Sequence, residues 1–411
     1  MDARARQELI EGLCAFEGRG PGTDAERRAA GWLRQRLRNV GRRAEIEPTY
    51  VHPQWSLVIA LHCVLAIAGG LLAREFGPGG FALVLFSATS LYLDQNTRLY
   101  ILRSLFFRRA SQNVVSPGDR PDAPARLVLS AHYDAARTGW IFGPRTDRAA
   151  RRLPEWARVP LGPIRLIFWA GMVPLLIISA LHAAGVDAGA LDVVQLFPTL
   201  LLLISTFLAI DIALSDLVPG AYDNASGVAT VLAAAQRLST DPPENLDVWV
   251  VLPGAEECNT EGMARWVRVH RKELDRANTY FVNVDSTSFG NVHYIAGEGA
   301  VLNHPTDRRL YELCEAVADA TDANARPVRI PLHTDALPLL ARGFRAISLI
   351  GATDGVGAPY YHTPEDTPDR VDHRSLNSAV DFTVALARAI DRDVTRAADR
   401  DSAATPEPAP V

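Results

Sequence analysis

A histidine and an aspartate two residues apart follow an apolar run of the sequence. The segment is LVLSAHYDAA, residues 127–136, and it carries His132 and Asp134. Side chains at positions i and i+2 of extended backbone point to the same side, so both can reach one point beyond the end of a strand. An imidazole with a carboxylate beside it suits a metal ligand and the group that orients it. Because short motifs also occur by chance on protein surfaces, this interpretation needs further residues.

Four later segments place carboxylates or imidazoles at the ends of expected helices and strands. Asp223 precedes a helix in GAYDNASG, where a carboxylate is otherwise an ordinary helix cap. Glu256 and Glu257 follow an apolar strand, and two adjacent buried carboxylates need positive charge nearby or a shared proton. In a solvated loop, by contrast, such a pair is ordinary. Asp285 ends the strand-like run FVNVD, and His362 lies among aromatic residues in PYYHTPEDT.

In this order the five motifs resemble peptidase family M28, the co-catalytic zinc peptidases of the aminopeptidase and carboxypeptidase II-like group. The resemblance covers roughly residues 8–48 and 111–392, and two apolar hairpins, one before His132 and one between His132 and Asp223, stand out as insertions. It implies that Asp134 orients His132 and that Glu256 is the general base. It also implies the metal ligands, which are His132, Asp223, Glu257, Asp285 and His362.

The ligand set that the resemblance implies has a defined chemistry. Two imidazoles and three carboxylates suit divalent ions such as Zn²⁺, and one bridging carboxylate allows two ions about 3.5 to 4 Å apart. Asp223 is the expected bridge, His132 and Asp285 would complete one site, and the other two ligands the second. A water between the ions would lose a proton near neutral pH, since zinc lowers its pKa to about 7. Glu256 would take that proton and return it to the leaving amine.

A further segment, LHTDALPLLARGFRAISL, resembles the part of the family that lines the substrate pocket. We therefore expect Asp335 and His333 near the site, with a purely structural role as the alternative for either residue. Tyr361, beside His362, is expected to contact the substrate.

The elements that must position these residues alternate between strand and helix. The pattern predicts an α/β fold with a mainly parallel or mixed central sheet flanked by helices, as in zinc aminopeptidases. Functional groups of such sheets gather at the carboxyl ends of the strands, where His132 and Asp285 fall. A helix over 23–41 has Thr23 as its expected N-cap. Strand-like runs lie at 246–252, 279–285 and 346–351, and helical stretches at 225–238, 260–275, 306–320 and 375–391.

Two pairs of apolar segments interrupt this pattern. The first pair is 56–73 and 81–93, and the second is 164–185 and 193–210. A membrane span needs about 20 apolar residues, so three of these segments qualify and 81–93 is marginal. We expect inserted membrane hairpins rather than buried ones, because buried helices usually keep one polar stripe.

These segments divide the chain into six parts. Catalytic parts at 1–50, 98–160 and 215–392 alternate with membrane hairpins at 51–97 and 161–214, and a polar tail at 393–411 is expected to be disordered. The second hairpin separates His132 from Asp223, so we expect the metal centre near the membrane surface. Arginines flank the hairpins, whereas their inner loops carry almost no basic residues. The positive-inside rule therefore predicts a protein of the cell membrane with a cytoplasmic catalytic domain.

Composition excludes several classes of protein. Of the 411 residues 48% are hydrophobic, which is rich for a purely soluble chain. The net charge of −5, without a basic stripe, argues against nucleic acid as a partner. The four cysteines lack CxxC spacing, so neither a disulfide framework nor a thiolate zinc site is indicated. The N-terminus lacks a signal-peptide layout, so the internal segments are the expected contact with membrane lipid.

The sequence thus predicts a membrane-anchored metallo-exopeptidase, an aminopeptidase that cleaves short peptides with two zinc ions. One alternative is a catalytically silent M28 relative that acts as a receptor or scaffold, but such a chain should lack a ligand or the base. Another is the regulatory domain of a membrane transporter, for which four helices with few intramembrane charges make a poor pathway. No residue pattern indicates an oligomeric state.

Overall fold

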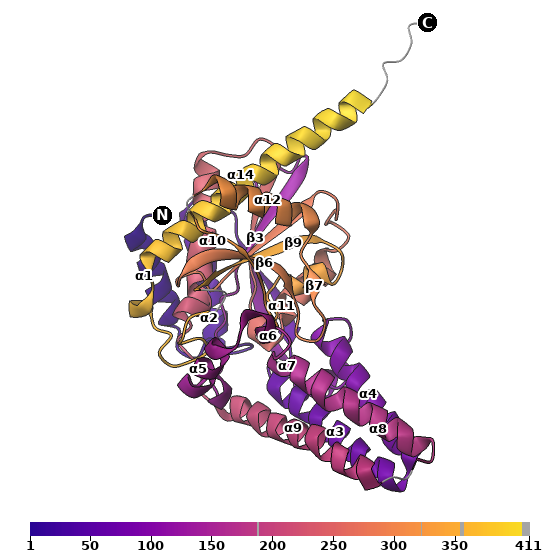
Figure 1. Ribbon diagram of the computed structural model, residues 1–411. Helices are drawn as coiled ribbons and strands as arrows, with labels where there is room; N and C mark the ends of the chain where they lie inside the picture. The colour runs from indigo at the N-terminus through magenta and orange to yellow at the C-terminus, as the bar shows by residue number, and fades with distance from the viewer. Residues whose placement is uncertain (187–188, 322, 354–356, 405–411) are drawn as a thin grey trace, which may run out of the picture.

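The computed structural model describes residues 1–186, 189–321, 323–353 and 357–404, and its centre is one mixed β-sheet (Figure 1). Among these residues the sheet has nine strands in the order β1-β2-β4-β3-β5-β9-β6-β7, with β8 beside β6. The strands are β1 Glu45–Val51, β2 Arg109–Ser116, β3 Ala125–Ser130, β4 Leu246–Leu252, β5 Thr279–Asp285, β6 Asn291–Glu298, β7 His304–Pro305, β8 Pro327–Arg329 and β9 Arg345–Ala352.

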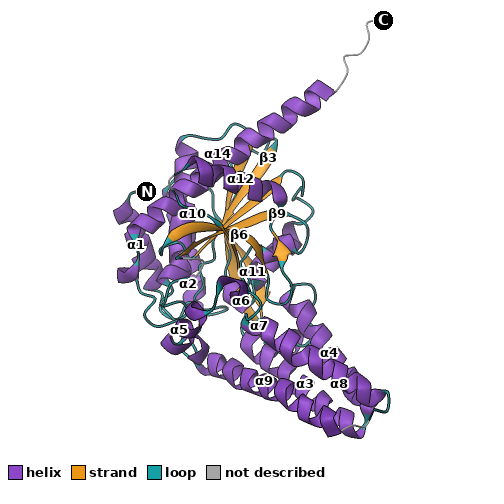
Figure 2. Cartoon of the chain, viewed as in Figure 1, coloured by secondary structure: helices purple, strands orange, loops and turns teal. Residues whose placement is uncertain are grey.

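The middle of the sheet is parallel and covered by helices on both faces (Figure 2). Strand β3 pairs in parallel with β4 and β5, and β5 pairs in parallel with β9. Leu127, Val128 and Leu129 of β3 are fully buried, as expected for a strand covered on both faces. One face packs against α1, α2, α10, α12 and α14, and the other against α11 and α13. These helices are α1 Ala3–Cys14, α2 Asp24–Asn39, α10 Ser226–Thr240, α11 Glu261–His270, α12 Arg308–Ala320, α13 Leu337–Leu340 and α14 His373–Ala404.

The predicted α/β fold with a mixed central sheet is confirmed. The strand-like runs at 246–252 and 279–285 are β4 and β5. The helix predicted over 23–41 is α2, and its cap forms as expected, because the Thr23 hydroxyl accepts the N–H of Glu26 at 3.1 Å. Periodicity and capping residues therefore located these elements correctly.

The C-terminal tail differs from the prediction. Helix α14 includes residues 393–404, where we expected disorder. The carboxylate of Asp393 accepts a hydrogen bond from Arg309 Nε at 2.8 Å, and Val394 packs against the main core. These contacts hold the first turn of a segment that has no apolar periodicity of its own. Residues 405–411 lie outside the described residues.

Apolar helices form an arm that projects from the sheet domain (Figure 1), which we call the helical arm. Three stretches of the described chain are long and apolar enough to cross a membrane, and they coincide with the three segments expected to qualify. The fourth helix, α4, contains the marginal segment. The elements of the arm are α3 Trp55–Glu75, α4 Gly77–Gln95, α7 Pro163–Arg165, the π-helical turn η3 Leu166–Met172, α8 Val173–Ala183 and α9 Gly189–Leu214. Two short helices, α5 Pro144–Arg152 and α6 Glu155–Arg158, lie between β3 and the arm.

A buried arginine joins the helical arm to the sheet domain. Arg103 donates to both carboxylate oxygens of Asp94, at 2.8 and 2.7 Å, and to the carbonyl of Cys258 at 2.9 Å. Asp94 lies in the last turn of α4, and Cys258 directly follows Glu257. The end of the first apolar hairpin is therefore fixed to the loop that carries the acidic pair.

Candidate metal centre

His132 and Asp134 lie just beyond the carboxyl end of β3, and both are buried. The Nδ1 atom of His132 is 3.5 Å from a carboxylate oxygen of Asp134. The two oxygens of Asp134 accept the backbone N–H groups of Glu256 and Glu257, each at 3.1 Å. Asp134 therefore holds the acidic loop after β4 in place beside the imidazole.

Asp223 lies between two imidazoles. One carboxylate oxygen is 3.1 Å from Nε2 of His132, and the other is 3.0 Å from Nε2 of His362. Asp223 precedes α10, whereas His362 comes from the loop that follows β9. A buried carboxylate with an imidazole on each oxygen has the arrangement that a bridging ligand requires.

Three further carboxylates complete the cluster. Glu257 Oε2 is 3.4 Å from Nε2 of His362. Asp285 Oδ1 and Glu256 Oε2 are 3.8 and 4.0 Å from Nε2 of His132. The sequence segments that carry these groups are far apart, and the carboxyl ends of β3, β4, β5 and β9 bring them together.

The donor set fits a divalent metal ion. Ligand atoms of His132, Asp223 and Glu257 lie within 4.8 Å of one another. Burial raises the pKa of Glu256 and of Glu257, since each carboxylate has lost water and faces other negative groups. Oε1 of Glu257 is buried and has no hydrogen-bond partner among the described residues. A cation bound here would compensate a concentration of buried negative charge that two imidazoles do not balance.

Comparison with known proteins finds a family match over part of the chain. Residues 206–387 match the model of peptidase family M28, and this range contains Asp223, Glu257, Asp285 and His362. This part of the chain is therefore similar to peptidase family M28. Aminopeptidase YwaD of Bacillus subtilis is 27% identical to this chain over 184 residues, which are 43% of this chain and 39% of YwaD.

Two solved structures share the fold of this protein. A Zn-dependent exopeptidase from Parabacteroides distasonis has a TM-score of 0.51 and 12% identity over 95% of this chain and 97% of its own. A glutaminyl cyclase from Bacteroides thetaiotaomicron, bound to N-acetylhistamine, has a TM-score of 0.53 and 14% identity over 94% of this chain and 97% of its own. Since one fold carries both activities, the fold alone does not determine the reaction.

All three residues predicted to contact substrate lie close to the metal centre. Asp335 is fully buried, and burial together with the charge of the metal-centre carboxylates raises its pKa. Tyr361 stacks on His362, with ring centroids 3.9 Å apart. His333 lies on the wall of a cavity beside the metal centre, and burial lowers its pKa to about 4, so it is neutral at neutral pH.

Sequence reasoning missed two residues that position the cluster. Asp366 accepts the backbone N–H of Tyr222 at 2.6 Å and that of Asp223 at 3.1 Å. Its signal was available, because it is the second acid of the PYYHTPEDT segment. Arg19 donates to the carbonyls of Tyr133, at 2.9 Å, and Gly220, at 2.6 Å, and so joins two loops that carry cluster residues. Nothing in the sequence around Arg19 pointed to that role.

We expect Asp366→Asn to weaken zinc binding by about 10- to 100-fold, the usual cost of losing a group that orients a ligand. An amide presents only one acceptor oxygen, so one of the two N–H groups at Tyr222 and Asp223 would lose its partner. Competition with a fluorescent zinc chelator measures the affinity. Asp369→Asn, an exposed change in the same segment, is the matched control. Equal affinities for Asp366→Asn and the wild type would show that Asp366 does not position the ligand.

Proposed function

We propose that this protein is a membrane-anchored, zinc-dependent aminopeptidase that removes N-terminal residues from short peptides. The observation that carries the proposal is the Asp223 carboxylate, whose two oxygens each face the Nε2 atom of a different histidine. That symmetry suits two divalent ions, one on each side. The family match and the aminopeptidase relative support the same reaction class.

We assign the cluster the roles expected from the sequence. Asp223 bridges, Asp134 orients the His132 ring, and Asp335 and Tyr361 border the substrate. Two bound zinc ions would supply a polarised peptide carbonyl and a water whose pKa is about 7. The ligands are His132, Asp223, Glu257, Asp285 and His362.

Glu256 is the proposed general base. Its carboxylate is 4.0 Å from His132 Nε2, at the edge of the cluster, and it has no contact with His362 comparable to that of Glu257. Burial raises the pKa of Glu256. The proton affinity of this carboxylate is thereby closer to that of the zinc-bound water that it would deprotonate. Glu256 would accept the proton from water and donate it to the leaving amine. The adjacent acids thus divide two tasks, with Glu257 as ligand and Glu256 as proton carrier.

The alternatives are less well supported. A silent receptor should have lost a ligand or the base, whereas this chain retains the complete set in one cluster. The exopeptidase and the glutaminyl cyclase share its fold equally well, so cyclisation is the alternative that an assay must exclude.

The test uses the full-length protein in lipid nanodiscs, with a panel of aminoacyl p-nitroanilides and a glutaminyl peptide. We expect hydrolysis that a chelator abolishes and zinc restores, and free glutamine plus a shortened peptide from the glutaminyl substrate. A pyroglutamyl product with loss of ammonia would identify a cyclase instead. Absence of any turnover in the zinc-loaded protein would favour the silent receptor.

We also infer on which side of the membrane the sheet domain lies. The arginine-rich flanks of the arm lie at its base, whereas Arg74 at its far end pairs with Asp192 at 2.7 Å. By the positive-inside rule the sheet domain is cytoplasmic. A Cys14→Ser, Glu17→Cys variant presents an exposed thiol on this domain. In intact cells it should resist an impermeant maleimide and react after permeabilisation, and labelling before permeabilisation would reverse the assignment.

A further inference from the structure

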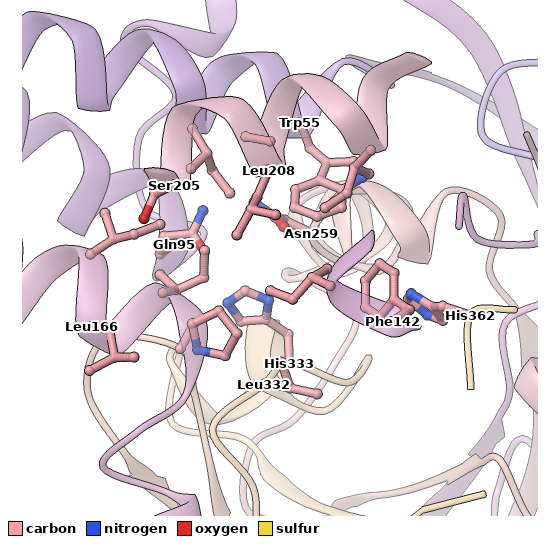
Figure 3. Close-up of a pocket in the computed structure, with 18 of the residues that line it drawn as sticks. Trp55, Gln95, Phe142, Leu166, Ser205, Leu208, Asn259, Leu332, His333 and His362 are labelled. Carbon is pink, nitrogen blue, oxygen red and sulfur yellow. The ribbon is translucent and has the colours of Figure 1, made fainter. Parts of the chain in front are cut away.

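A cavity of about 310 Å³ connects the candidate metal centre with the helical arm. At one end it is lined by Glu256, Glu257 and His362. From there it runs between α9 on one side and His333 with Leu332 on the other (Figure 3). The cavity is therefore polar where the cluster lies and apolar over most of its remaining wall.

One stripe of α9 forms the long side of this cavity. It consists of Leu201, Ser205, Leu208 and Ile212, spaced three or four residues apart, which places them on one face of the helix. At about 1.5 Å per residue, the stripe runs about 16 Å along the helix axis. An extended chain of about five residues, or an alkyl chain of the same length, fits along it. This length exceeds what a single N-terminal side chain needs.

Other parts of the cavity wall also belong to the arm. Ile164 and Ile167 come from the start of the Pro163–Ala183 stretch, and Trp55 and Ile59 come from α3. All three stretches are candidate membrane spans. Much of the apolar part of the cavity is therefore built from the same helices that would contact lipid, and Leu332 with Phe142 adds apolar wall from the sheet domain.

Apolar side chains that line the cavity also reach the molecular surface. Ile204 of α9 is 57% exposed, and Leu161, which precedes α7, is 42% exposed. The lining of the cavity therefore includes apolar side chains that are accessible from outside the protein. Exposed apolar rims of this kind mark contact with lipid or with an apolar ligand.

We propose that the substrate carries a long apolar group beside its scissile amide and reaches the metal centre sideways from the bilayer. This inference rests on the proposed function, since an aminopeptidase has only one residue on the acyl side of the cleaved bond. The long group must therefore lie on the side of the leaving amine. Water adds its oxygen to the carbonyl carbon, the C–N bond breaks, and the amine with its apolar group leaves with a proton. An alkyl chain and an apolar peptide segment share this chemistry.

The experiment compares long with short leaving groups in nanodiscs of phosphatidylcholine. The substrates are leucyl-dodecylamide against leucyl-butylamide, and pentaleucine against leucyl-tetraserine. We expect kcat/KM to be about tenfold or more higher for the long apolar member of at least one pair, because each buried methylene favours binding. A preference in the first pair alone identifies an alkyl chain, and a preference in the second alone identifies a peptide segment.

A cavity-filling variant tests the site itself. Leu208→Trp should lower the ratio of long-substrate to short-substrate kcat/KM by about tenfold, because the indole occupies the apolar channel. Because both substrates are assayed with the same preparation, differences between variants in folded fraction and in zinc content cancel in this ratio. Phe207→Trp is the control. Phe207 directly precedes Leu208 in α9, is 65% exposed and does not line the cavity. The ratio of this variant should therefore equal that of the wild type.

The outcomes separate this inference from the proposed function. If leucyl-p-nitroanilide is hydrolysed but the wild type does not distinguish long from short substrates, apolar entry is wrong and the peptidase assignment stands. The same conclusion follows if Leu208→Trp leaves the ratio unchanged. If no substrate is hydrolysed by the zinc-loaded protein, the proposed function itself fails.

Discussion

Glu256→Gln should lower the turnover of leucyl-p-nitroanilide by about 10²- to 10⁴-fold, the usual contribution of a general base. The amide has nearly the same shape as the carboxylate but cannot accept the proton from water. Because Glu256 is not an assigned ligand, the zinc content of the variant should equal that of the wild type. Steady-state kinetics and metal analysis of the same preparation measure both quantities.

Glu365→Gln is the matched control for this prediction. Glu365 is exposed and lies in the loop that carries His362, so its charge is removed near the site without a change in the cluster. We expect wild-type turnover from it. Near-normal turnover of Glu256→Gln would remove Glu256 from the mechanism, and loss of zinc would make it a ligand.

Asp223→Ala should abolish both zinc binding and hydrolysis. The substitution removes the one carboxylate that contacts both imidazoles, so neither ion would keep its full ligand set. We expect less than one zinc per chain after dialysis against metal-free buffer, and turnover at the background rate. Inductively coupled plasma mass spectrometry gives the zinc content, and circular dichroism shows whether the variant is folded.

Asp216→Ala provides the comparison for that loss. Asp216 is exposed and lies shortly before the same loop, and its side chain does not belong to the cluster. Zinc content and turnover should therefore match the wild type. If Asp223→Ala instead retains two zinc ions per chain, the assignment of the bridge is wrong.

The fold was predictable from the pattern of strands and helices, whereas the cluster was implied by the resemblance of five motifs to peptidase family M28. The apolar runs that became β4 and β5 end at the acidic segments, and parallel strands bring their carboxyl ends to one edge of a sheet. Asp366 could also have been found, since it stands in a segment already singled out. Its partners, the N–H groups of Tyr222 and Asp223, could not be inferred without the fold.

The cavity could not be predicted from the sequence. Helix α9 is apolar on all sides, so hydrophobic periodicity does not distinguish Leu208, which lines the cavity, from Phe207, which points away from it. Other parts of the cavity wall come from segments more than a hundred residues apart in the chain, such as those of Trp55 and Ile164. Which apolar residues lie beside the metal centre depends on how the arm packs against the sheet domain.

The tail shows a related limit. Residues 393–404 lack apolar periodicity, which is typical of disorder, yet they extend a helix that is already formed. Pairing of Asp393 with Arg309 depends on a long-range contact that no local pattern encodes. Propagating an existing helix also costs less free energy than starting one.

Anomalous diffraction at the zinc edge, from crystals of the zinc-loaded protein, tests the central claim most directly. We expect two peaks per chain, one on each side of the Asp223 carboxylate, with His132 beside one and His362 beside the other. A single peak, or zinc bound elsewhere with these five ligands empty, would contradict it.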